Sequence, residues 1–285
     1  MRASILINNY NYAAYLGEAI DSALAQDWDD VEVIVVDDGS TDGSAAVLDA
    51  YEDRVVVVRK PNGGQASAFN AGFEHATGSI VFLLDADDLF LPGKVRAVLE
   101  ALEEARELEW CFHPLAYQGG EGPEQRGATG VVDARATMRQ GRAPGVLASA
   151  TTGLAFRRTL LDEILPMPEA IRITADNYLK AVALSLAPGR VLDERLAVQR
   201  IHGANLYTGA DADDPRRAAV ELQIAAALRE RWPHLRRYAV ARGIGAVRMA
   251  GGEVPVDGFL QHCNTLERCR VGIHRGVWRY RAWRR

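Results

Sequence analysis

The sequence predicts an α/β protein with a mostly parallel central sheet, and three observations lead to this fold class. Short apolar runs of strand length alternate with segments of helical periodicity over about the first hundred residues. Four such strand–helix units follow one another, an order that favours parallel strands joined by right-handed crossovers. The last of the four strands, residues 80–84, is apolar throughout, as expected of a strand that is buried on both faces.

The elements can be placed along the chain from these patterns. Strands are expected where apolar residues concentrate, at residues 3–7, 31–36, 54–59, 80–84 and 110–113. Helices are expected where apolar side chains recur every three or four positions, at residues 12–26, 44–51, 66–75 and 214–231. Another helix is expected to begin near Pro92 and to end at residue 107, because proline is favoured in the first turn of a helix. Beyond Trp232 the helical signal weakens, since several glycines interrupt the chain.

Length and composition indicate a globular protein of one large domain or two small ones. The chain has 285 residues, of which 48% are hydrophobic and 25% are charged. It lacks the run of about 18 apolar residues that a transmembrane helix needs. Its first residues enter a strand pattern without the plan of a signal peptide, so we expect a cytoplasmic protein. The three cysteines, Cys111, Cys263 and Cys269, suggest neither a disulfide framework nor a zinc site.

The net charge of −5 argues against a general nucleic-acid-binding protein, but the charge is distributed unevenly. Residues 266–285, which we call the basic tail, contain seven arginines and one glutamate among apolar and aromatic residues. A basic amphipathic segment with tryptophan is typical of peripheral contact with an anionic membrane, here at its inner face. A solvated tail or a contact between protein copies fits the same composition.

Three carboxylates directly follow the strand at residues 80–84: Asp85, Asp87 and Asp88, which we call the acid cluster. They are expected at the carboxyl end of a central strand, where open α/β sheets bind their ligands. Like charges this close repel one another unless a cation or hydrogen-bond donors offset them, and a hard divalent metal with a phosphorylated ligand would do so. The alternative is a solvated acidic turn that caps the helix beginning near Pro92.

Two further polar turns are expected at the same edge, after the first and second strands. Asn8 and Tyr10 offer an amide group and an aromatic face to a nucleotide base. Asp38 can accept a hydrogen bond from the imide N–H of uracil or from the amide-type edge of another base, although it also fits a helix N-cap. Together with the acid cluster, these turns indicate a nucleotide-diphosphate site.

The motifs of other phosphate-binding enzymes are missing from the sequence. No Gly-x-Gly-x-x-Gly follows the first strand and the chain contains no Gly-x-x-x-x-Gly-Lys-Ser/Thr, which excludes a dinucleotide-binding dehydrogenase and a P-loop ATPase. An aspartyl phosphatase would have Thr or Val where Leu89 stands, and its motif would lie near the start of the chain. We therefore expect another class of nucleotide-dependent enzyme.

The order of the motifs resembles that of the family-two glycosyltransferases of GT-A fold, of bacterial type. The resemblance is dense over about residues 3–95 and can be followed to about residue 207; it is carried by residues 4–11, 19–26, 35–42, 62–65, 70–72, 76–78 and 84–88. It implies a Rossmann-like, mostly parallel sheet with flanking helices at residues 1–210, with a nucleotide-binding half at 1–105 and an acceptor half at 106–210. A C-terminal helical region with the basic tail would follow at 211–285.

The resemblance also implies an activity, the inverting and metal-dependent transfer of a sugar from a nucleotide-diphosphate sugar. A UDP-sugar is the first expectation, with a hydroxyl of a saccharide or lipid-linked acceptor, as in cell-surface polysaccharide or glycoconjugate synthesis. In the family, the position of Asp38 contacts the base, and those of Asp85 and Asp87 form the Asp-x-Asp motif that holds the ribose and Mg2+ or Mn2+. The metal offsets charge on the departing nucleotide diphosphate. The same resemblance assigns nucleotide binding to Asn8, Tyr10, Gly64, Gln65 and Asn70.

Two positions depart from the family pattern. Asn8 stands where the family commonly has proline, and Phe69 stands where it commonly has arginine. Loss of the arginine removes a contact to phosphate or base, which leaves the identity of the base open. We expect Phe69 to pack within its helix rather than to stack on a base.

An inverting transfer needs a carboxylate that takes the proton of the acceptor hydroxyl as its oxygen attacks. The family usually carries it in a Glu-Asp pair that opens an apolar helix, and here Ala175 and Asp176 hold these positions. Asp176 is therefore the candidate base, and the alternative is an acid that stabilises the helix N-terminus through the macrodipole. Glu163 and Glu169 are nearby substitutes.

Residues 196–205 resemble the closing Arg-x-His-x-x-Asn element of the family, formed here by Arg200, His202 and Asn205. Alternation along a strand would place Arg200 and His202 on one face. A neutral imidazole at His202 would complete the metal shell or hydrogen-bond the diphosphate. Arg200, Asn205 and Asp88 are expected to support the site.

Two alternative functions stay open at this point. A sugar nucleotidyltransferase shares the sheet and the metal carboxylates, but it would have a Gly-rich loop with Arg and Lys where residues 8–12 stand. A non-catalytic nucleotide-sugar-binding protein would keep only the nucleotide site, and Ala175 and Phe69 are compatible with it.

Overall fold

The computed structural model describes residues 1–122, 125, 127–146, 149–203, 205, 215–250, 256–261, 263–265, 267, 268 and 271. The chain forms two compact units. The first comprises Met1–Asp133, Gly145–Asp176 and Ala187–Thr208, and the second comprises Ala134–Pro144, Asn177–Leu186 and Gly209–Arg285. The domain boundary expected at residue 210 stays a prediction.

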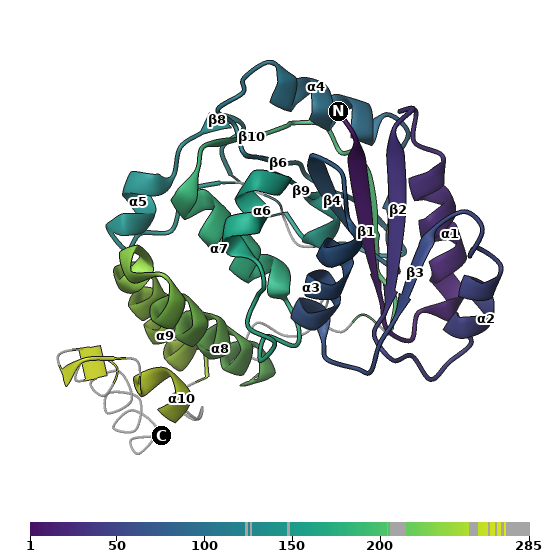
Figure 1. The fold of residues 1–285 in the computed structure, drawn as a ribbon. Coiled ribbons are helices and arrows are strands. Elements are labelled where there is room, and N and C mark those ends of the chain that lie inside the picture. The colour runs from purple at the N-terminus through teal and green to yellow at the C-terminus, as the bar shows by residue number, and fades with distance from the viewer. Residues whose placement is uncertain are drawn as a thin grey trace. The chain divides into compact units, whose positions relative to one another are not determined.

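An eight-stranded sheet forms the frame of the first unit, with the strand order β3-β2-β1-β4-β9-β6-β10-β8 (Figure 1). Its first four strands are parallel neighbours: β1 (Ala3–Asn9), β2 (Val31–Asp37), β3 (Val56–Arg59) and β4 (Ile80–Asp85). They are connected by the helices α1 (Ala13–Leu24), α2 (Ser44–Asp49) and α3 (Gln65–His75). The predicted α/β class with a mostly parallel sheet is confirmed.

The other half of this sheet has mixed strand directions. The strand β9 (Leu154–Arg157) runs antiparallel to both β4 and β6 (Trp110–Phe112), and β10 (Gly189–Val191) runs parallel to β6. The edge strand β8 (Gly130–Val132) is antiparallel to β10. The short 3-10 helix η1 (Thr151–Gly153) leads into β9, and α6 (Arg158–Ile164) follows β9.

A second sheet, of three strands in the order β5-β11-β7, brings distant parts of the chain together. The strand β11 (Ala197–Arg200) is antiparallel to β5 (Leu89–Phe90) and parallel to β7 (Ala116–Gln118). The strand β5 follows the acid cluster, and α4 (Lys94–Glu103) begins two residues after Pro92, near the expected start. The end of α4 at Glu103 corrects the expected end at residue 107. His202 lies beyond the end of β11, so the expectation that it alternates with Arg200 within one strand is wrong.

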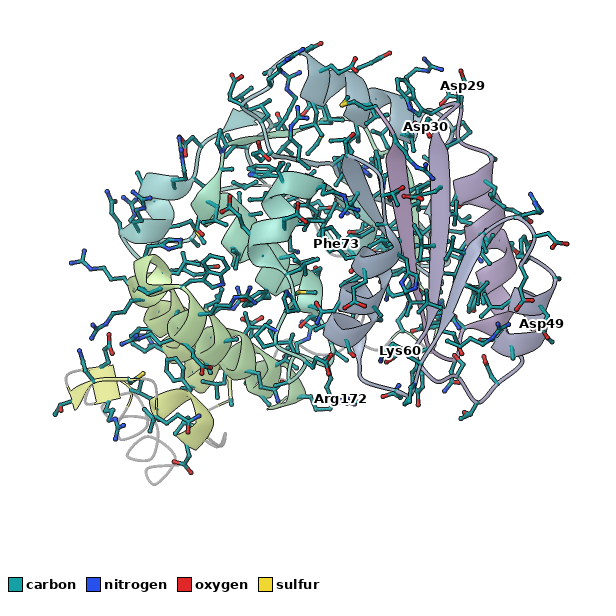
Figure 2. The ribbon with its side chains drawn as sticks, viewed as in Figure 1. Asp29, Asp30, Asp49, Lys60, Phe73 and Arg172 are labelled. Carbon is teal, nitrogen blue, oxygen red and sulfur yellow. The ribbon has the colours of Figure 1, made fainter. Side chains whose placement is uncertain are left out.

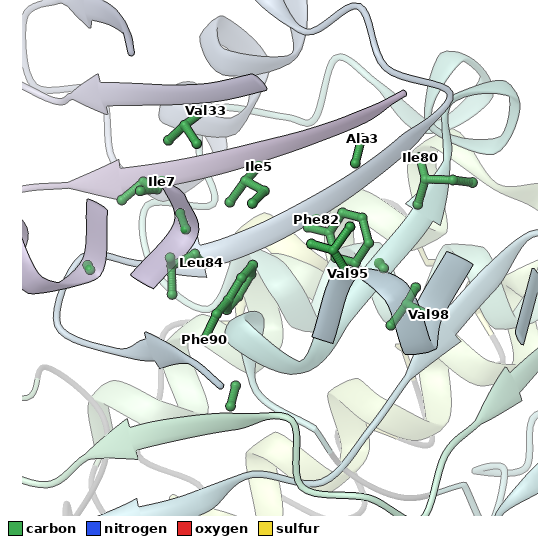
Figure 3. Close-up of a cluster of buried hydrophobic side chains, with 14 of the residues drawn as sticks. Ala3, Ile5, Ile7, Val33, Ile80, Phe82, Leu84, Phe90, Val95 and Val98 are labelled. Atoms are coloured by element: carbon green, nitrogen blue, oxygen red, sulfur yellow. The ribbon is translucent and has the colours of Figure 1, made fainter. Parts of the chain in front are cut away.

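One face of the parallel strands packs against α1 and α4 in the core of the first unit. Alternate residues share this face, among them Ile5 and Ile7 of β1 and Phe82 and Leu84 of β4, all fully buried (Figure 3). The helix α3 covers the opposite face, where Gly72 lies so close that an added Cβ would be 3.1 Å from Val36 Cγ2. Burial on both faces explains why these strands are continuously apolar.

The described part of the second unit is helical. It contains α5 (Arg135–Arg139), most of α7 (Ala175–Leu186), α8 (Pro215–Arg231), α9 (Arg236–Met249) and α10 (Asp257–Leu260). The helix α8 confirms the prediction up to Arg231, and α9 is a further helix in the region where the helical signal of the sequence weakens. Gly243 of α9 allows close packing, since a Cβ added there would lie 2.4 Å from Phe259 Cζ, whereas a Cβ added to Gly245 would meet nothing within 4 Å.

Within the described ranges, no helix combines the length and the apolar character that crossing a membrane requires. Of the basic tail, the structure describes only Glu267, Arg268 and Val271. The predicted membrane or oligomer contact of residues 266–285 therefore lies largely outside the described residues.

Candidate active site

The acid cluster lies at the carboxyl edge of the parallel strands, together with the turns that follow β1 and β2. Parallel pairing of β1 with β4 places Asn8 opposite Asp85. Figure 2 shows Lys60 and Arg172 at this edge of the sheet, while Asp30 lies at the other edge, where β2 begins. Segments that are far apart in the sequence therefore meet at the edge expected to bind a ligand.

Asp85 is held by polar groups from three other segments. Its Oδ1 accepts hydrogen bonds from Asn8 Nδ2 at 3.1 Å and from Gln65 Nε2 at 3.3 Å. Its backbone N–H donates to Thr152 Oγ1 at 3.2 Å. Burial, followed by the charge of Asp87, raises the pKa of Asp85 to about 7. A cation at this site would favour the ionised form.

Asp87 is the carboxylate that the closing element surrounds. Its Oδ2 lies 3.1 Å from His202 Nε2 and accepts a hydrogen bond from Asn205 Nδ2 at 3.1 Å. The backbone N–H of His202 donates to Asn205 Oδ1 at 2.6 Å, which ties the two residues together. Burial raises the pKa of Asp87, and the charge of His202 acts in the opposite direction. The structure thus brings these three predicted site residues together.

Asp88 is buried behind the other two acids. Its Oδ2 accepts a hydrogen bond from Thr152 Oγ1 at 2.5 Å, and its Oδ1 accepts one from the backbone N–H of Arg200 at 3.1 Å. The residue before α4 is Gly93, and no side chain caps that helix. The alternative of a helix cap is therefore wrong for Asp88, whose carboxylate instead joins η1 to β11.

Two tyrosines of the α1 region, which the sequence analysis does not single out, form an aromatic wall beside His202. The ring of Tyr15 stacks on His202 with centroids 4.4 Å apart, and the ring of Tyr12 meets His202 edge-on at 5.9 Å. The Arg200 guanidinium lies 5.2 Å from the Tyr15 ring centroid and 3.1 Å from Glu18 Oε2. Burial, then the charges of the acid cluster, raise the pKa of Tyr12. The signal available in the sequence is an aromatic pair three residues apart at the start of a helix that follows the first polar turn.

Thr152 and Lys94 are further residues that the sequence analysis does not assign. Lys94 is fully buried; its Nζ donates to the carbonyl oxygen of Thr152 and lies 3.6 Å from the ring centroid of Phe90. Burial lowers the pKa of Lys94 well below its usual value. The hydroxyl of Thr152 contacts both Asp85 and Asp88, as described above. A lysine in the apolar pattern of α4 is the signal that could have pointed to this buried contact.

Asp176 lies in the first turn of α7 and is buried, with 7% of its surface exposed. Its charge is among those that raise the pKa of Asp85, so it acts on the acid cluster from nearby. The substitutes Glu163 and Glu169 are exposed, and neither is among the groups that shift the pKa of Asp85. Asp176 therefore lies nearer the acid cluster in its electrostatic effect than the two glutamates, and its role as the base stays a prediction.

Asp38 organises the turn before α3. It is 3% exposed, and its carboxylate accepts hydrogen bonds from Lys60 Nζ at 2.6 Å, Gly63 N at 2.9 Å and Gly64 N at 2.6 Å. Gly64 has a φ of +87°, a conformation that favours glycine. Since a carboxylate has about four acceptor positions, these donors leave about one for a base. The contact of Asp38 with a base stays a prediction.

Two other residues assigned to the nucleotide differ in their accessibility. Tyr10 is 41% exposed, so its ring is available at the surface. Asn70 has a partner within the chain, because its Nδ2 donates to the carbonyl oxygen of Met167 at 3.0 Å and its Oδ1 accepts from Met167 N at 2.7 Å. Both residues stay predictions as nucleotide contacts, and Asn70 has a structural task as well.

The donor set of the site suits a hard divalent cation. Asp85 and Asp87 supply carboxylate oxygens, and Asn8 Oδ1 is a buried amide oxygen that has no hydrogen-bond partner in the described part of the chain. The described residues contain no group of three His, Cys, Asp or Glu already arranged around a metal position. The chemistry of the residues fits Mn2+ or Mg2+, and their present contacts are with one another.

Comparison with known proteins places this geometry in a family context. A model of the family described as Glycosyl transferase family 2 matches residues 4–165. An uncharacterized glycosyltransferase of Nostoc sp. (strain PCC 7120) is 36% identical over 222 residues, which cover 74% of this chain and 68% of the relative.

Solved structures show the same fold at low sequence identity. The structure of S. aureus TarS 1-349 in complex with UDP-GlcNAc aligns with a TM-score of 0.66 at 19% identity, over 98% of this chain and 80% of that one. The mannosyltransferase PcManGT from Pyrobaculum calidifontis, in complex with GDP-Man and Mn2+, aligns with a TM-score of 0.54 at 19% identity, over 97% and 86% of the two chains.

Proposed function

The chain belongs to glycosyl transferase family 2 and is a glycosyltransferase, and we propose that it transfers a sugar from a nucleotide-diphosphate sugar to a hydroxyl group with inversion. The donor is a UDP-sugar and the reaction depends on Mn2+ or Mg2+. The acceptor is a saccharide or a lipid-linked saccharide in the synthesis of a cell-surface polysaccharide or glycoconjugate. The observation that carries the proposal is the convergence of Asp85, Asp87, His202 and Asp176 at the carboxyl edge of the sheet.

The structural neighbours support a nucleotide-diphosphate sugar as the donor. TarS is described with UDP-GlcNAc and PcManGT with GDP-Man and Mn2+, so the two differ in their base. For this chain its own residues favour a pyrimidine with an imide N–H. Asp38 keeps about one acceptor position, which matches the single imide N–H of uracil or thymine, and the exposed ring of Tyr10 offers a face for stacking. Comparison of UDP- with dTDP-sugars decides between the two bases.

Asp85, Asp87 and His202 are the residues that would hold the cation. A bound divalent cation offsets the negative charge that develops on a departing diphosphate. His202 Nε2 and Asn205 Nδ2 both contact Asp87 Oδ2 at 3.1 Å, so they orient the carboxylate that would hold the cation. The side-chain amide nitrogens of Asn8 and Gln65, which donate to Asp85 Oδ1, would keep Asp85 in place.

Asp176 takes the proton of the acceptor hydroxyl in the proposed reaction. As the acceptor oxygen forms its bond to the anomeric carbon, the bond from that carbon to the diphosphate oxygen breaks on the opposite side. The electron pair leaves with the nucleoside diphosphate, and the proton passes from the hydroxyl to the Asp176 carboxylate. Burial of Asp176 limits the access of water to the base.

The test uses the purified full chain with UDP-, GDP- and dTDP-sugars, each with and without Mn2+. We expect a metal-dependent thermal shift and release of nucleoside diphosphate, both largest with UDP-sugars. Asp87→Ala should lose both, whereas Asp49→Ala should keep both because Asp49 is an exposed acid on α2 that pairs with Arg59 (Figure 2).

Other outcomes would identify the alternatives. Pyrophosphate released from a nucleoside triphosphate would indicate a sugar nucleotidyltransferase. Binding of the nucleotide sugar without either product would indicate a non-catalytic binding protein. A metal-dependent shift of Asp87→Ala equal to that of the wild type would overturn the proposed metal site.

A further inference from the structure

Gln65 connects the acid cluster to the start of α7, and its side-chain amide is used at both ends. Its Nε2 donates to Asp85 Oδ1 at 3.3 Å and to Thr151 Oγ1 at 3.4 Å. Its Oε1 accepts a hydrogen bond from the backbone N–H of Ala175 at 2.8 Å. Ala175 directly precedes Asp176, so one side chain contacts a proposed metal ligand and the residue next to the proposed base.

The partners of Gln65 fix the direction of its amide group. The backbone N–H of Ala175 can only donate, so the amide oxygen must face α7. The Asp85 carboxylate accepts hydrogen bonds, so the amide nitrogen must face the acid cluster. A side chain of the same length without polar atoms would make neither contact.

The first turn of α7 needs the contact with Gln65, because Thr174, the residue before the helix, does not cap it. The first N–H groups of a helix have no partner within the helix. Thr174, the residue before α7, has a φ of +52°, and its Oγ1 is buried without a hydrogen-bond partner among the residues that the structure describes. Such a backbone conformation persists where its surroundings hold it. Gln65 therefore supplies from α3 the acceptor that Thr174 does not.

The backbone of Gln65 is itself fixed against the segment before α7. Its N–H donates to the carbonyl oxygen of Arg172 at 2.8 Å. Gly64 packs so closely on the same residue that an added Cβ would lie 2.7 Å from Arg172 Cα. The side chain of Gln65 therefore projects from an anchored position toward its partners at both ends.

We propose that Gln65 is a positioning residue that holds Asp85 and Asp176 at a fixed separation. The inference rests on the proposed function, because an inverting displacement needs the leaving diphosphate and the base on opposite sides of one carbon. Small displacements of either group slow such a reaction strongly. The resemblance to the family assigns Gln65 to the nucleotide, whereas its contacts here are with groups of the chain itself.

The test compares Gln65→Met with Asn62→Ala in the full chain. Methionine keeps the length of the side chain and removes both polar ends. Asn62→Ala breaks the contact to Arg172 in the same region without touching Asp85 or Ala175. Three quantities are measured: the Mn2+ concentration that gives half of the thermal shift with UDP, the kcat and KM for UDP release from UDP-GlcNAc, and the hydrogen exchange of the Ala175 amide.

We expect Gln65→Met to need about 10-fold more Mn2+, as loss of a group that orients a metal ligand typically does. Its kcat should fall about 10- to 100-fold with a smaller change in KM, and the Ala175 amide should exchange faster. Asn62→Ala should match the wild type in all three. Wild-type behaviour of Gln65→Met, or the same losses in both variants, would overturn the inference alone. A wild type that neither shifts with UDP and Mn2+ nor releases UDP would overturn the proposed function and this inference with it.

Discussion

The ring of Tyr15 lies stacked on the imidazole of His202, with centroids 4.4 Å apart and planes inclined by 20°. His202 in turn places its Nε2 3.1 Å from Asp87. An exposed helix start is thereby linked through two rings to the proposed metal ligand. His202 follows the end of β11, and its ring is contacted by Tyr15, by Tyr12 edge-on and by Asp87.

Replacement of Tyr15 tests whether the stack matters for activity. We expect Tyr15→Leu to lower kcat/KM for nucleoside-diphosphate release by up to about tenfold, since a stacked aromatic pair contributes about 0.5–1.5 kcal/mol. Tyr15→Phe keeps the ring and should stay close to the wild type. The measurement is a Mn2+ titration of UDP release for both variants. Equal rates for the leucine and phenylalanine variants would show that the stack does not orient His202.

Replacement of Asp176 tests the assignment of the base. Asp176→Asn keeps the shape of the side chain but cannot take a proton, so kcat for sugar transfer or donor hydrolysis should fall by about 10²- to 10⁴-fold. The thermal shift with UDP and Mn2+ should persist. The matched controls are Glu163→Gln and Glu169→Gln, exposed acids that should leave kcat unchanged. A large loss in either control, with an active Asp176→Asn, would move the base to that glutamate.

Replacement of Thr152 tests the support behind the acid cluster. Thr152→Val removes the hydroxyl that donates to the buried carboxylate of Asp88 and accepts from Asp85 N. Leaving a buried polar group without its partner costs about 1–3 kcal/mol in the free energy of unfolding. Thr152→Ser keeps the hydroxyl and should recover most of the loss. Denaturant unfolding of the two variants measures the difference, and equal stabilities would mean that the hydroxyl contributes nothing.

The inner strands of the parallel half of the main sheet could be predicted because they are buried on both faces, unlike the edge strand β3, whose Val56 is 42% exposed. The runs at β1, β2 and β4 are therefore apolar and continuous, and the helices between them show their own period. The strands β8, β9 and β10 are three or four residues long and pair with segments far away in the chain. Three or four residues are too few to show the alternation of apolar and polar side chains that marks a strand. These strands are therefore recognised only from their pairing in the folded sheet.

The candidate site could be predicted where it depends on local spacing and not where it depends on distant pairing. Asp85 ends β4 and Asp87 follows two residues later, so the apolar run before them is enough to place both at the end of a strand. The amide of Asn70 pairs instead with the backbone of Met167, and that of Gln65 with Ala175. Nothing near Asn70 or Gln65 in the sequence indicates these partners, which lie about a hundred residues away along the chain. The nucleotide contacts that the family motif assigns to both residues stay predictions.

The motif at residues 76–78 belongs to the family pattern but lies away from the candidate site, at the end of the sheet where the parallel strands begin. Its backbone binds a carboxylate of β2. The Glu32 carboxylate accepts hydrogen bonds from Thr77 N at 2.6 Å, Gly78 N at 3.0 Å and Ser4 Oγ at 2.5 Å. We expect Glu32→Gln to lower the free energy of unfolding by about 1–3 kcal/mol, because an amide replaces an acceptor that several donors share. UDP release should stay at the wild-type rate. A loss of kcat without a loss of stability would contradict this structural assignment.

Because of Glu267, the stability of the second unit is expected to fall as the pH is lowered. Burial opposes its ionisation, but hydrogen bonds from Arg236, Asn264 N and Arg229 outweigh burial and lower the pKa of Glu267 to about 2. A glutamate in an unfolded chain has a pKa of about 4.3, so the unfolded state binds the proton more readily. The contribution of Glu267 to stability is therefore complete above about pH 5 and is lost as the pH falls toward 2.

Glu267→Gln removes the charge that the two arginines share and should flatten this dependence. Both ion pairs are partly open to solvent, with Arg236 42% and Arg229 15% exposed, so screening reduces their effect. We expect the wild type to lose about 1–2 kcal/mol more than the variant between pH 6 and pH 3. Thermal unfolding at several pH values, followed by a probe in the second unit, measures the difference. Parallel curves for the wild type and Glu267→Gln would mean that the Glu267 carboxylate titrates alike in the folded and unfolded chain.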